Sequence, residues 1–343
     1  MFSLLKKRPR IALHAKINEA EIDISPKETL LQAALSNGID FPHSCKVGGC
    51  ATCKCKLLEG RVKELTDFGY VLNEEELAQG YILACQSAPE TDIRVSVMRQ
   101  VSQHEAVLGR IIHQQTLTPD ITYIKVLLER ELGYLAGQFA DLTINSANCG
   151  PRSYSFAEPP SIEGTVSFYV RKVAGGQFST LVSDPDLLGT YITIDGPKGD
   201  FWLRENNAPL LFVAGGSGLA PILAMLEAAS TKDRPTTLLF AAKTQSDLYA
   251  LERLKSISQG WQAPFTFIPV LSRESETSDW QGERGRVTDV LHSINVDGCN
   301  AYLCGAPALV DEVETLLTAK GITRQCIFSD RFLTTADMAP SRS

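Results

Sequence analysis

Residues 43–53 read His-Ser-Cys-Lys-Val-Gly-Gly-Cys-Ala-Thr-Cys, and this stretch dictates how the first part of the chain folds. Its three cysteines have the C-x4-C-x2-C spacing that is typical of a 2Fe–2S site. Such a site needs a fourth thiolate from a more distant segment, and the sequence Ile82-Leu83-Ala84-Cys85 is placed to supply one. We therefore predict that the cluster ligands are Cys45, Cys50, Cys53 and Cys85.

Two other uses of these cysteines fit the pattern less well. A structural zinc site more usually shows two C-x2-C pairs, and here a single pair follows a C-x4-C. A disulfide framework is typical of short secreted chains, whereas this chain has 343 residues and nine cysteines, an odd number. The iron–sulfur interpretation is therefore preferred over both.

Composition limits the possible functions. The length predicts two or three domains, because domains usually have roughly 100–150 residues. A net charge of −7 argues against a general nucleic-acid-binding protein. No apolar run approaches the roughly 20 residues that a membrane span requires. The apolar start at residues 1–5 is too short for a signal peptide, so we expect a cytoplasmic protein without a membrane span.

The first segment, residues 1–100, alternates strand and helix patterns around the cysteine loop. Alternating apolar residues predict two short strands within residues 10–24, and Thr29 is a suitable cap for a helix over 30–36. Further strands are expected at 54–58 and 93–97, with a short helix at 74–79 before Cys85. This order resembles the β-grasp fold of ferredoxins. Cys55 falls outside the ligand spacing and is expected to be a small buried side chain.

The second segment, residues 101–205, predicts a small antiparallel barrel. After a polar linker at 98–105, short alternating stretches recur between glycines and prolines. They are residues 111–112, 121–128, 139–144, 166–171 and 191–194.

Two motifs in the barrel segment can bind a flavin nucleotide. In Arg152-Ser153-Tyr154-Ser155 the arginine can pair with a diphosphate, the tyrosine can stack on a ring, and the hydroxyl of Ser155 can hydrogen-bond to a ring nitrogen. On its own, this motif would also suit a surface strand. In Gly175-Gly176-Gln177-Phe178-Ser179 two glycines precede a short helix, as in anion sites and also in simple turns.

The third segment, residues 206–343, has the pattern of a doubly wound parallel sheet. The apolar run at 210–214 predicts a buried strand, and Gly215-Gly216-Ser217-Gly218 then leads into an apolar helix. Strand, glycine loop and helix form a cradle for a dinucleotide diphosphate. Asp247 follows the next strand and can accept hydrogen bonds from ribose hydroxyls. We see no Ser/Arg cluster that would bind a 2′-phosphate, which favours NADH over NADPH. Lys243 is a mild indication of NADPH, because its side chain could contact that phosphate.

Taken together, the motifs resemble those of the ferredoxin-NADP-reductase superfamily. They are Arg152-Ser-Tyr-Ser, Gly175-Gly-x-x-Ser, Gly196-Pro-x-Gly-x-Phe and Leu303-Cys-Gly, placed after a plant-type cluster segment. Within the superfamily, the chain is similar to the fused reductase components of bacterial oxygenases. It most resembles the xylene monooxygenase reductase and its relatives in the set Cys45-Lys-Val-Gly-Gly-Cys50, Arg152-Ser-Tyr-Ser, Trp280-Gln-Gly-Glu-Arg-Gly and Leu303-Cys-Gly. The resemblance implies FAD ligands at Arg152, Ser153, Tyr154, Ser155, Arg171, Gly175, Gly176, Ser179 and Phe332.

The resemblance also implies a catalytic group and an activity. It places Cys304 and Gly305 beside the nicotinamide, and Asp330 near the flavin. The catalytic residues are then Ser155, Cys304 and Asp330. The implied fold is a multi-domain α/β and β chain with a β-grasp ferredoxin, an antiparallel FAD-binding barrel and a doubly wound NAD-binding domain.

The function implied is electron transfer from NADH through FAD and a 2Fe–2S cluster to an oxygenase. The acceptor is expected to be a Rieske or di-iron enzyme of aromatic or hydrocarbon degradation, reached directly or through an intermediate ferredoxin, and the reductase is expected to be a monomer. Two alternatives stay open: a reductase for a deoxysugar dehydratase, and a redox sensor that uses the same cofactors.

Overall fold

The computed structural model describes residues 13–25, 28–39, 41–43, 48, 51–72, 74–97, 106–147, 149–229 and 232–332. The chain divides into two compact units, Met1–Ser102 and Gln103–Ser343. The expected linker at 98–105 lies outside the described residues.

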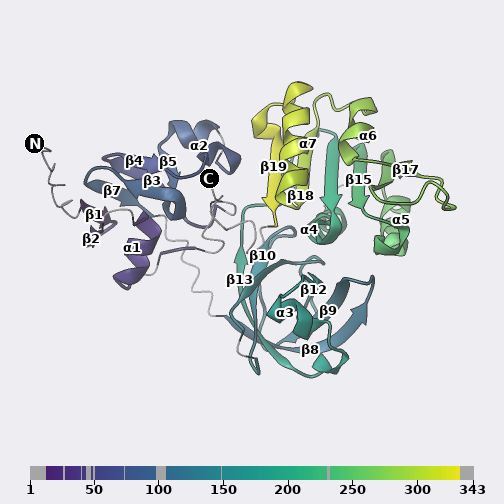
Figure 1. Ribbon diagram of the computed structural model, residues 1–343, viewed down its shortest axis with the longest axis horizontal. Coiled ribbons are helices and arrows are strands. Elements are labelled where there is room, and N and C mark those ends of the chain that lie inside the picture. The colour runs from purple at the N-terminus through teal and green to yellow at the C-terminus, as the bar shows by residue number, and fades with distance from the viewer. Residues whose placement is uncertain are drawn as a thin grey trace, which may run out of the picture. The chain divides into compact units, whose positions relative to one another are not determined.

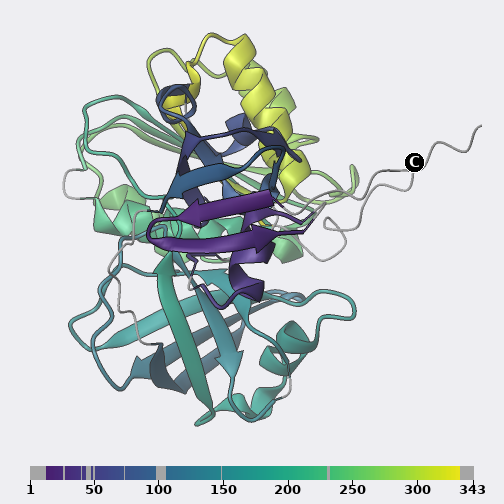
Figure 2. The ribbon, with the colours of Figure 1, turned by 90° about the vertical axis from the view of Figure 1, so that its left-hand side faces the viewer.

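The first unit contains a mixed five-stranded sheet. Its strand order is β2-β1-β7-β3-β5, in which β1 and β7 are parallel and the other neighbours are antiparallel. The hairpin predicted at 10–24 is confirmed, and Figure 2 shows it as the two purple arrows. The strands are β1 (Leu13–Ile17), β2 (Ala20–Ile24), β3 (Lys54–Glu59), β5 (Tyr81–Leu83) and β7 (Ile93–Ser96).

Helix α1 (Leu30–Ser36) covers this sheet and begins where the sequence predicts. The side chain of Thr29 accepts from the backbone of Gln32, and the side chain of Gln32 accepts from the backbone of Thr29, so two helix-end N–H groups are satisfied. Four apolar residues of α1 are buried in the core of the unit. The smaller elements are β4 (Val62–Glu64), η1 (Phe68–Tyr70), α2 (Glu74–Ala78), η2 (Ala84–Gln86) and β6 (Ser87–Pro89).

The second unit begins with an antiparallel barrel of six strands in the order β11-β10-β13-β8-β9-β12. The two outer strands meet where Phe156, just after β11, bridges Phe168 of β12, and Ala157 N–H donates to Ser167 C=O at 2.9 Å. This closure confirms the predicted barrel. Its elements are β8 (Val107–Thr116), β9 (Ile121–Leu128), β10 (Phe139–Ile144), β11 (Arg152–Ser155), β12 (Thr165–Arg171), α3 (Gln177–Val182), η3 (Pro185–Leu187) and β13 (Tyr191–Lys198).

The rest of the second unit is a parallel sheet in the order β17-β16-β15-β14-β18-β19. Figure 1 shows α6 and α7 beside this sheet, with α4 on its barrel side. Helices on both faces are typical of a doubly wound fold. The elements are β14 (Leu210–Gly215), η4 (Gly216–Gly218), α4 (Leu219–Ala228), β15 (Thr236–Ala242), η5 (Gln245–Asp247), α5 (Leu251–Gln259), β16 (Phe265–Leu271), β17 (Glu283–Arg284), α6 (Val287–Ser293), β18 (Asn300–Gly305), α7 (Pro307–Ala319), η6 (Arg324–Cys326) and β19 (Ile327–Arg331).

One hydrophobic cluster joins the barrel to the parallel sheet. Tyr169 and Phe201 of the barrel side are buried in the same cluster as Phe212, Phe240 and much of α4. A polar contact reinforces this junction. Arg253 of α5 donates to Tyr169 Oη at 2.9 Å and to Ala157 C=O at 2.8 Å, while both oxygens of Glu227 accept from it at 2.6 Å.

No helix within the described ranges is both long and apolar enough to cross a lipid bilayer.

Candidate functional site

Two of the four predicted cluster ligands are described, and they come together. Cys53 enters β3 and Cys85 lies in η2, and both side chains are buried. The backbone N–H of Ala84 donates to Cys53 C=O at 3.1 Å, so the two cysteine segments run side by side. Cys45 and Cys50 lie outside the described residues.

Gly48, between the two undescribed cysteines, also lies against the Cys85 segment. A Cβ atom added at Gly48 would be 2.8 Å from Cγ of Gln86, the neighbour of Cys85. The backbone at Gly48 has φ +82°, which favours glycine. Gly48 and Cys53 therefore both lie beside the Cys85 segment, as a site with ligands from both segments requires.

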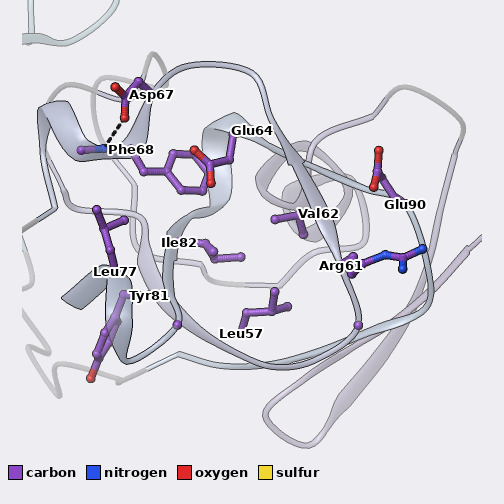
Figure 3. A pocket seen from close by; sticks show the side chains of 13 residues that line it. Leu57, Arg61, Val62, Glu64, Asp67, Phe68, Leu77, Tyr81, Ile82 and Glu90 are labelled. Atoms are coloured by element: carbon purple, nitrogen blue, oxygen red, sulfur yellow. Dashed lines mark hydrogen bonds between the residues drawn. The ribbon is translucent and has the colours of Figure 1, made fainter. Parts of the chain in front are cut away.

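The first unit also has a surface groove of about 580 Å³ (Figure 3). Its apolar side includes Leu57, Val62, Phe68 and Leu77, and charged residues such as Glu64, Asp67 and Glu90 lie at its margin. Neither Cys53 nor Cys85 lines it. The groove is therefore a surface feature separate from the predicted cluster site.

In the barrel, strand β11 presents the R-x-Y-S motif beside α3. The ring of Tyr154 stacks on Phe178 of α3, with centroids 5.2 Å apart, and this contact joins β11 to the Gly-Gly loop. Arg152, two residues earlier, is exposed, and its Nη1 donates to the carbonyl groups of Gly150 and Pro151. The arrangement places an arginine and a glycine loop on neighbouring elements, as a diphosphate site would need.

Ser155 carries the clearest sign of a missing partner. Its side chain is buried, and its Oγ has no hydrogen-bond partner among the residues that the structure describes. A buried hydroxyl without a partner is costly, by about 1–3 kcal/mol. A ring nitrogen of a bound flavin would satisfy it, so the residues present fit FAD. The hydroxyl of Ser153, in contrast, donates to Asp141.

The Gly-Gly loop is closed by Ser179. The backbone at Gly175 has φ +74°, and Gly176 caps α3. Ser179 Oγ accepts from Val173 N–H at 3.2 Å and donates to Gly176 C=O at 3.3 Å. Ser179 therefore holds the shape of the loop and leaves its exposed surface open.

The glycine loop of the parallel sheet follows β14 and precedes α4. A Cβ atom at Gly218 would lie 2.3 Å from Cys304 C=O, and one at Gly305, where φ is +152°, would lie 3.2 Å from the backbone of Gly215. The ends of β14 and β18 can approach this closely because both positions are glycine. The N-terminus of α4 and the carboxyl ends of the strands then meet at one edge, where a dinucleotide fits.

Cys304 and Asp330 are direct partners across β18 and β19. Cys304 is completely buried, and burial, followed by the negative charge of Asp330, raises the pKa of its thiol well above the ordinary value. The thiol is therefore neutral at physiological pH. A neutral, buried thiol is a poor nucleophile, so the role predicted for Cys304 beside a nicotinamide would be packing. Phe332 N–H donates to Gly305 C=O at 2.8 Å, which places Phe332 at the same edge.

Arg171, predicted among the FAD ligands, lies at the glycine loop. Its Nη1 is 3.4 Å from the position of a Cβ at Gly216, and its Nε donates to Asp120 at 2.8 Å. The carbonyl of Gly216 accepts from the buried hydroxyl of Tyr249 at 2.9 Å. Sequence patterns missed Tyr249, because a buried tyrosine gives no local motif.

Asp247 has a local role at the ribose edge. Its Oδ2 accepts from the N–H and the hydroxyl of Thr244 at 2.9 and 2.8 Å, which closes η5. One carboxylate oxygen thus has protein donors already, and the predicted ribose contact would use the other.

The expectation that no Ser/Arg cluster at the ribose edge favours a 2′-phosphate stays a prediction, although strand pairing brings a serine and an arginine near Lys243. Ser272 and Arg273 follow β16, and Arg273 N–H donates to Lys243 C=O at 2.8 Å. Adjacent parallel strands bring these residues together although they are far apart in sequence. Glu274 comes next; its carboxylate accepts from Gln245 N–H at 2.7 Å, and this bond lowers its pKa.

Three family profiles match this chain in succession. They are the 2Fe-2S iron-sulfur cluster binding domain at residues 14–90, the oxidoreductase FAD-binding domain at 109–202 and the oxidoreductase NAD-binding domain at 212–315.

Individual relatives match over nearly the whole length. The xylene/toluene monooxygenase electron transfer component of Pseudomonas putida is 40% identical over 89% of this chain and 89% of its own. The phenol 2-monooxygenase reductase component of Pseudomonas sp. (strain CF600) is 31% identical, with 94% of each chain covered. A CDP-6-deoxy-L-threo-D-glycero-4-hexulose-3-dehydrase reductase of Yersinia pestis is 32% identical over 89% of this chain and 93% of its own.

A solved structure has the same arrangement of elements. The Amycolatopsis cytochrome P450 reductase superposes with a TM-score of 0.68 at 27% identity, covering 93% of this chain and 98% of that one.

Proposed function

Because this chain belongs to the family of reductase components that join a 2Fe–2S domain to FAD- and NAD-binding domains, we propose that it supplies electrons from NADH to an oxygenase. The observation that carries the proposal is the succession of the three domains in one chain, shared with a monooxygenase electron transfer component over 89% of the length. The proposed acceptor is an oxygenase of aromatic or hydrocarbon degradation.

The residues of the chain would bind and orient three carriers. Bound FAD would supply the change from two-electron to one-electron chemistry, and a bound 2Fe–2S cluster would supply one-electron transfer. The glycine loop at 215–218 would hold the NADH diphosphate, and Cys304 and Gly305 would pack beside the nicotinamide. Ser155 Oγ would hydrogen-bond to the flavin, and four thiolates that include Cys53 and Cys85 would hold the cluster.

Charged residues at the ribose edge bear on the choice between NADH and NADPH. Glu274 is negatively charged at neutral pH, and the hydrogen bond from the backbone of Gln245 lowers its pKa further. A carboxylate here repels a 2′-phosphate, although Lys243 and Arg273 on the same edge attract one. Because these charges act in opposite directions, a direct comparison of NADH and NADPH as donors is informative.

An anaerobic titration with NADH, followed by absorption and EPR, tests the proposed function. We expect the flavin and cluster bands to bleach together and an EPR signal of the reduced cluster to grow. Flavin bleaching without that signal in iron-replete protein would contradict the cluster assignment. No bleaching with NADH, but full bleaching with NADPH, would contradict the donor.

The acceptor can be tested separately. The similarity to a CDP-6-deoxyhexulose dehydrase reductase supports a second candidate, a reductase of a deoxysugar dehydratase. Reconstitution of the pre-reduced protein with either type of acceptor distinguishes the two, since only the physiological partner should reoxidise the cluster rapidly.

An Arg152→Ala variant should retain FAD poorly. The guanidinium group contacts only carbonyl groups of its own loop in the described structure, so its removal should disturb the barrel little while removing a charge from the diphosphate site. A charged hydrogen bond is worth about 1.5–3 kcal/mol, which predicts roughly a 10- to 100-fold higher Kd for FAD. Fluorescence titration of the FAD-free protein measures it. Arg110→Ala, an exposed position on β8, serves as the control, and an unchanged Kd in Arg152→Ala would refute the assignment.

A further inference from the structure

The two faces of the C-terminal strand β19 differ: one face has aromatic residues in the hydrophobic core, and the other has polar residues that contact α7. Phe328 and Phe332 pack against the hydrophobic cluster that joins the barrel to the sheet, and alternation puts Asp330 on that face. The positions between them, Ser329 and Arg331, face the other way. Figure 1 shows α7 beside β19, and Arg331 reaches that helix.

The side chain of Arg331 is 8% exposed and makes a network of polar contacts. Nε donates to Asp311 Oδ1 of α7 at 2.8 Å, Nη1 donates to Ser329 Oγ at 2.7 Å, and Nη2 pairs with Glu314 Oε2 of α7. Glu314 is also nearly buried, and its second oxygen pairs with Arg324 at 3.1 Å. Two cations and two carboxylates therefore neutralise one another around the end of β19.

This network lies next to the residues that the proposed function places at the nicotinamide. Asp330 is the register partner of Cys304, Arg331 is the partner of Gly305, and Phe332 N–H donates to Gly305 C=O. Among the described strands, β19 lies at the edge of the sheet and pairs with β18 on one side. A strand at an edge has fewer backbone bonds to hold its end, so side-chain anchors matter more there.

We propose that Arg331 is a positioning residue for hydride transfer. Its clamp onto Asp311 and Glu314 of α7 fixes the end of β19, and thereby holds Asp330 and Phe332 beside Cys304 and Gly305. Arg331 faces away from the cofactor edge and acts through its neighbours. The inference rests on the proposed function and adds to it a group that sets the geometry of the reaction.

Stopped-flow reduction of the FAD-loaded protein by NADH, and by NADH deuterated at nicotinamide C4, tests the clamp. In Arg331→Met the limiting rate of flavin reduction should fall roughly 10- to 100-fold, because misplacing reacting groups by about 1 Å costs about that much. The dissociation constant for NADH should change less than threefold, and the deuterium isotope effect should persist or increase. Arg331→Lys keeps a positive charge and should recover part of the rate.

The matched control is Arg286→Met. Arg286 pairs with Glu312 on the same helix α7, but its side chain is 66% exposed, and it lies far along the chain from β19. The limiting rate of flavin reduction in Arg286→Met should stay within twofold of the rate in the parent protein. An equal loss in Arg286→Met and Arg331→Met would overturn the proposal, because the effect would then come from α7 in general.

If Arg331→Met does not fold, the double variant Asp311→Asn/Glu314→Gln provides the test, since it keeps the side-chain volumes and removes the charge of both carboxylate partners of Arg331. A folded variant of either kind with the parent rate overturns the positioning role. Flavin reduction in the parent protein distinguishes the two proposals. If NADH fails to reduce the parent protein, the proposed function is overturned. If the parent protein and the variants are reduced at the same normal rate, only the positioning role of Arg331 is overturned.

Discussion

A Cys53→Ser variant is expected to lose nearly all NADH-driven reduction of cytochrome c while its flavin is still reduced rapidly. Cys53 is buried beside the Cys85 segment, and a serine hydroxyl is a much poorer ligand for an iron–sulfur cluster than a thiolate. Even loss of an outer-shell partner of a metal ligand costs about 10–100-fold, so loss of a ligand should cost more than 100-fold. Steady-state cytochrome c reduction and stopped-flow flavin reduction measure the two halves of the pathway.

Cys55→Ala is the matched control for this experiment. Cys55 is two residues away and equally buried, but it lies outside the ligand spacing, and burial raises the pKa of its thiol. The variant should keep the cluster spectrum and at least half of the cytochrome c activity. A cluster that survives Cys53→Ser but is lost in Cys55→Ala would show that the ligand set is misassigned.

A Ser155→Ala variant is expected to reduce its flavin roughly 10- to 100-fold more slowly than the parent protein. The buried hydroxyl has no partner within the described structure, so a bound flavin is the group that would use it. A hydrogen bond that strengthens as charge develops is worth about 1.5–3 kcal/mol, and each 1.4 kcal/mol is tenfold in rate. Single-turnover reduction by saturating NADH measures the change.

Stability provides an independent check on the same variant. Removing a buried hydroxyl that lacks a partner should leave the free energy of unfolding of the FAD-free protein unchanged or raise it by about 1 kcal/mol. Thr165→Val removes a second buried hydroxyl without a described partner, on β12, and should leave flavin reduction unchanged. If Ser155→Ala destabilises the FAD-free protein while the rate holds, the hydroxyl is structural.

Much of the fold follows from local patterns. The strands predicted at 121–128 and 139–144 are confirmed to the residue, because alternation of apolar side chains and flanking turn residues define both ends. The capping residues at Thr29 likewise locate the start of α1. The parallel sheet is apparent from its apolar runs and from the glycine loop after 210–214.

The site is less predictable where distant segments meet. Arg273 lies beside Lys243 only because β15 and β16 are neighbours, and the contacts of Arg331 with Glu314 depend on how β19 packs on α7. No local motif signals either contact. The assignments of Ser155, Cys304, Asp330 and the cluster cysteines remain predictions, with Cys45 and Cys50 outside the described residues.

The junction between the barrel and the parallel sheet limits how such a chain can be rebuilt by recombination. Arg253 spans it with bonds to Tyr169, Ala157 and Glu227, and the aromatic side chains of both halves share one interior. A foreign barrel would have to supply matching acceptors and apolar surface, or leave the half-buried Arg253 paired with Glu227 alone and part of the shared core uncovered. The barrel and the parallel sheet would therefore have to be exchanged together, whereas the first compact unit has a hydrophobic core of its own.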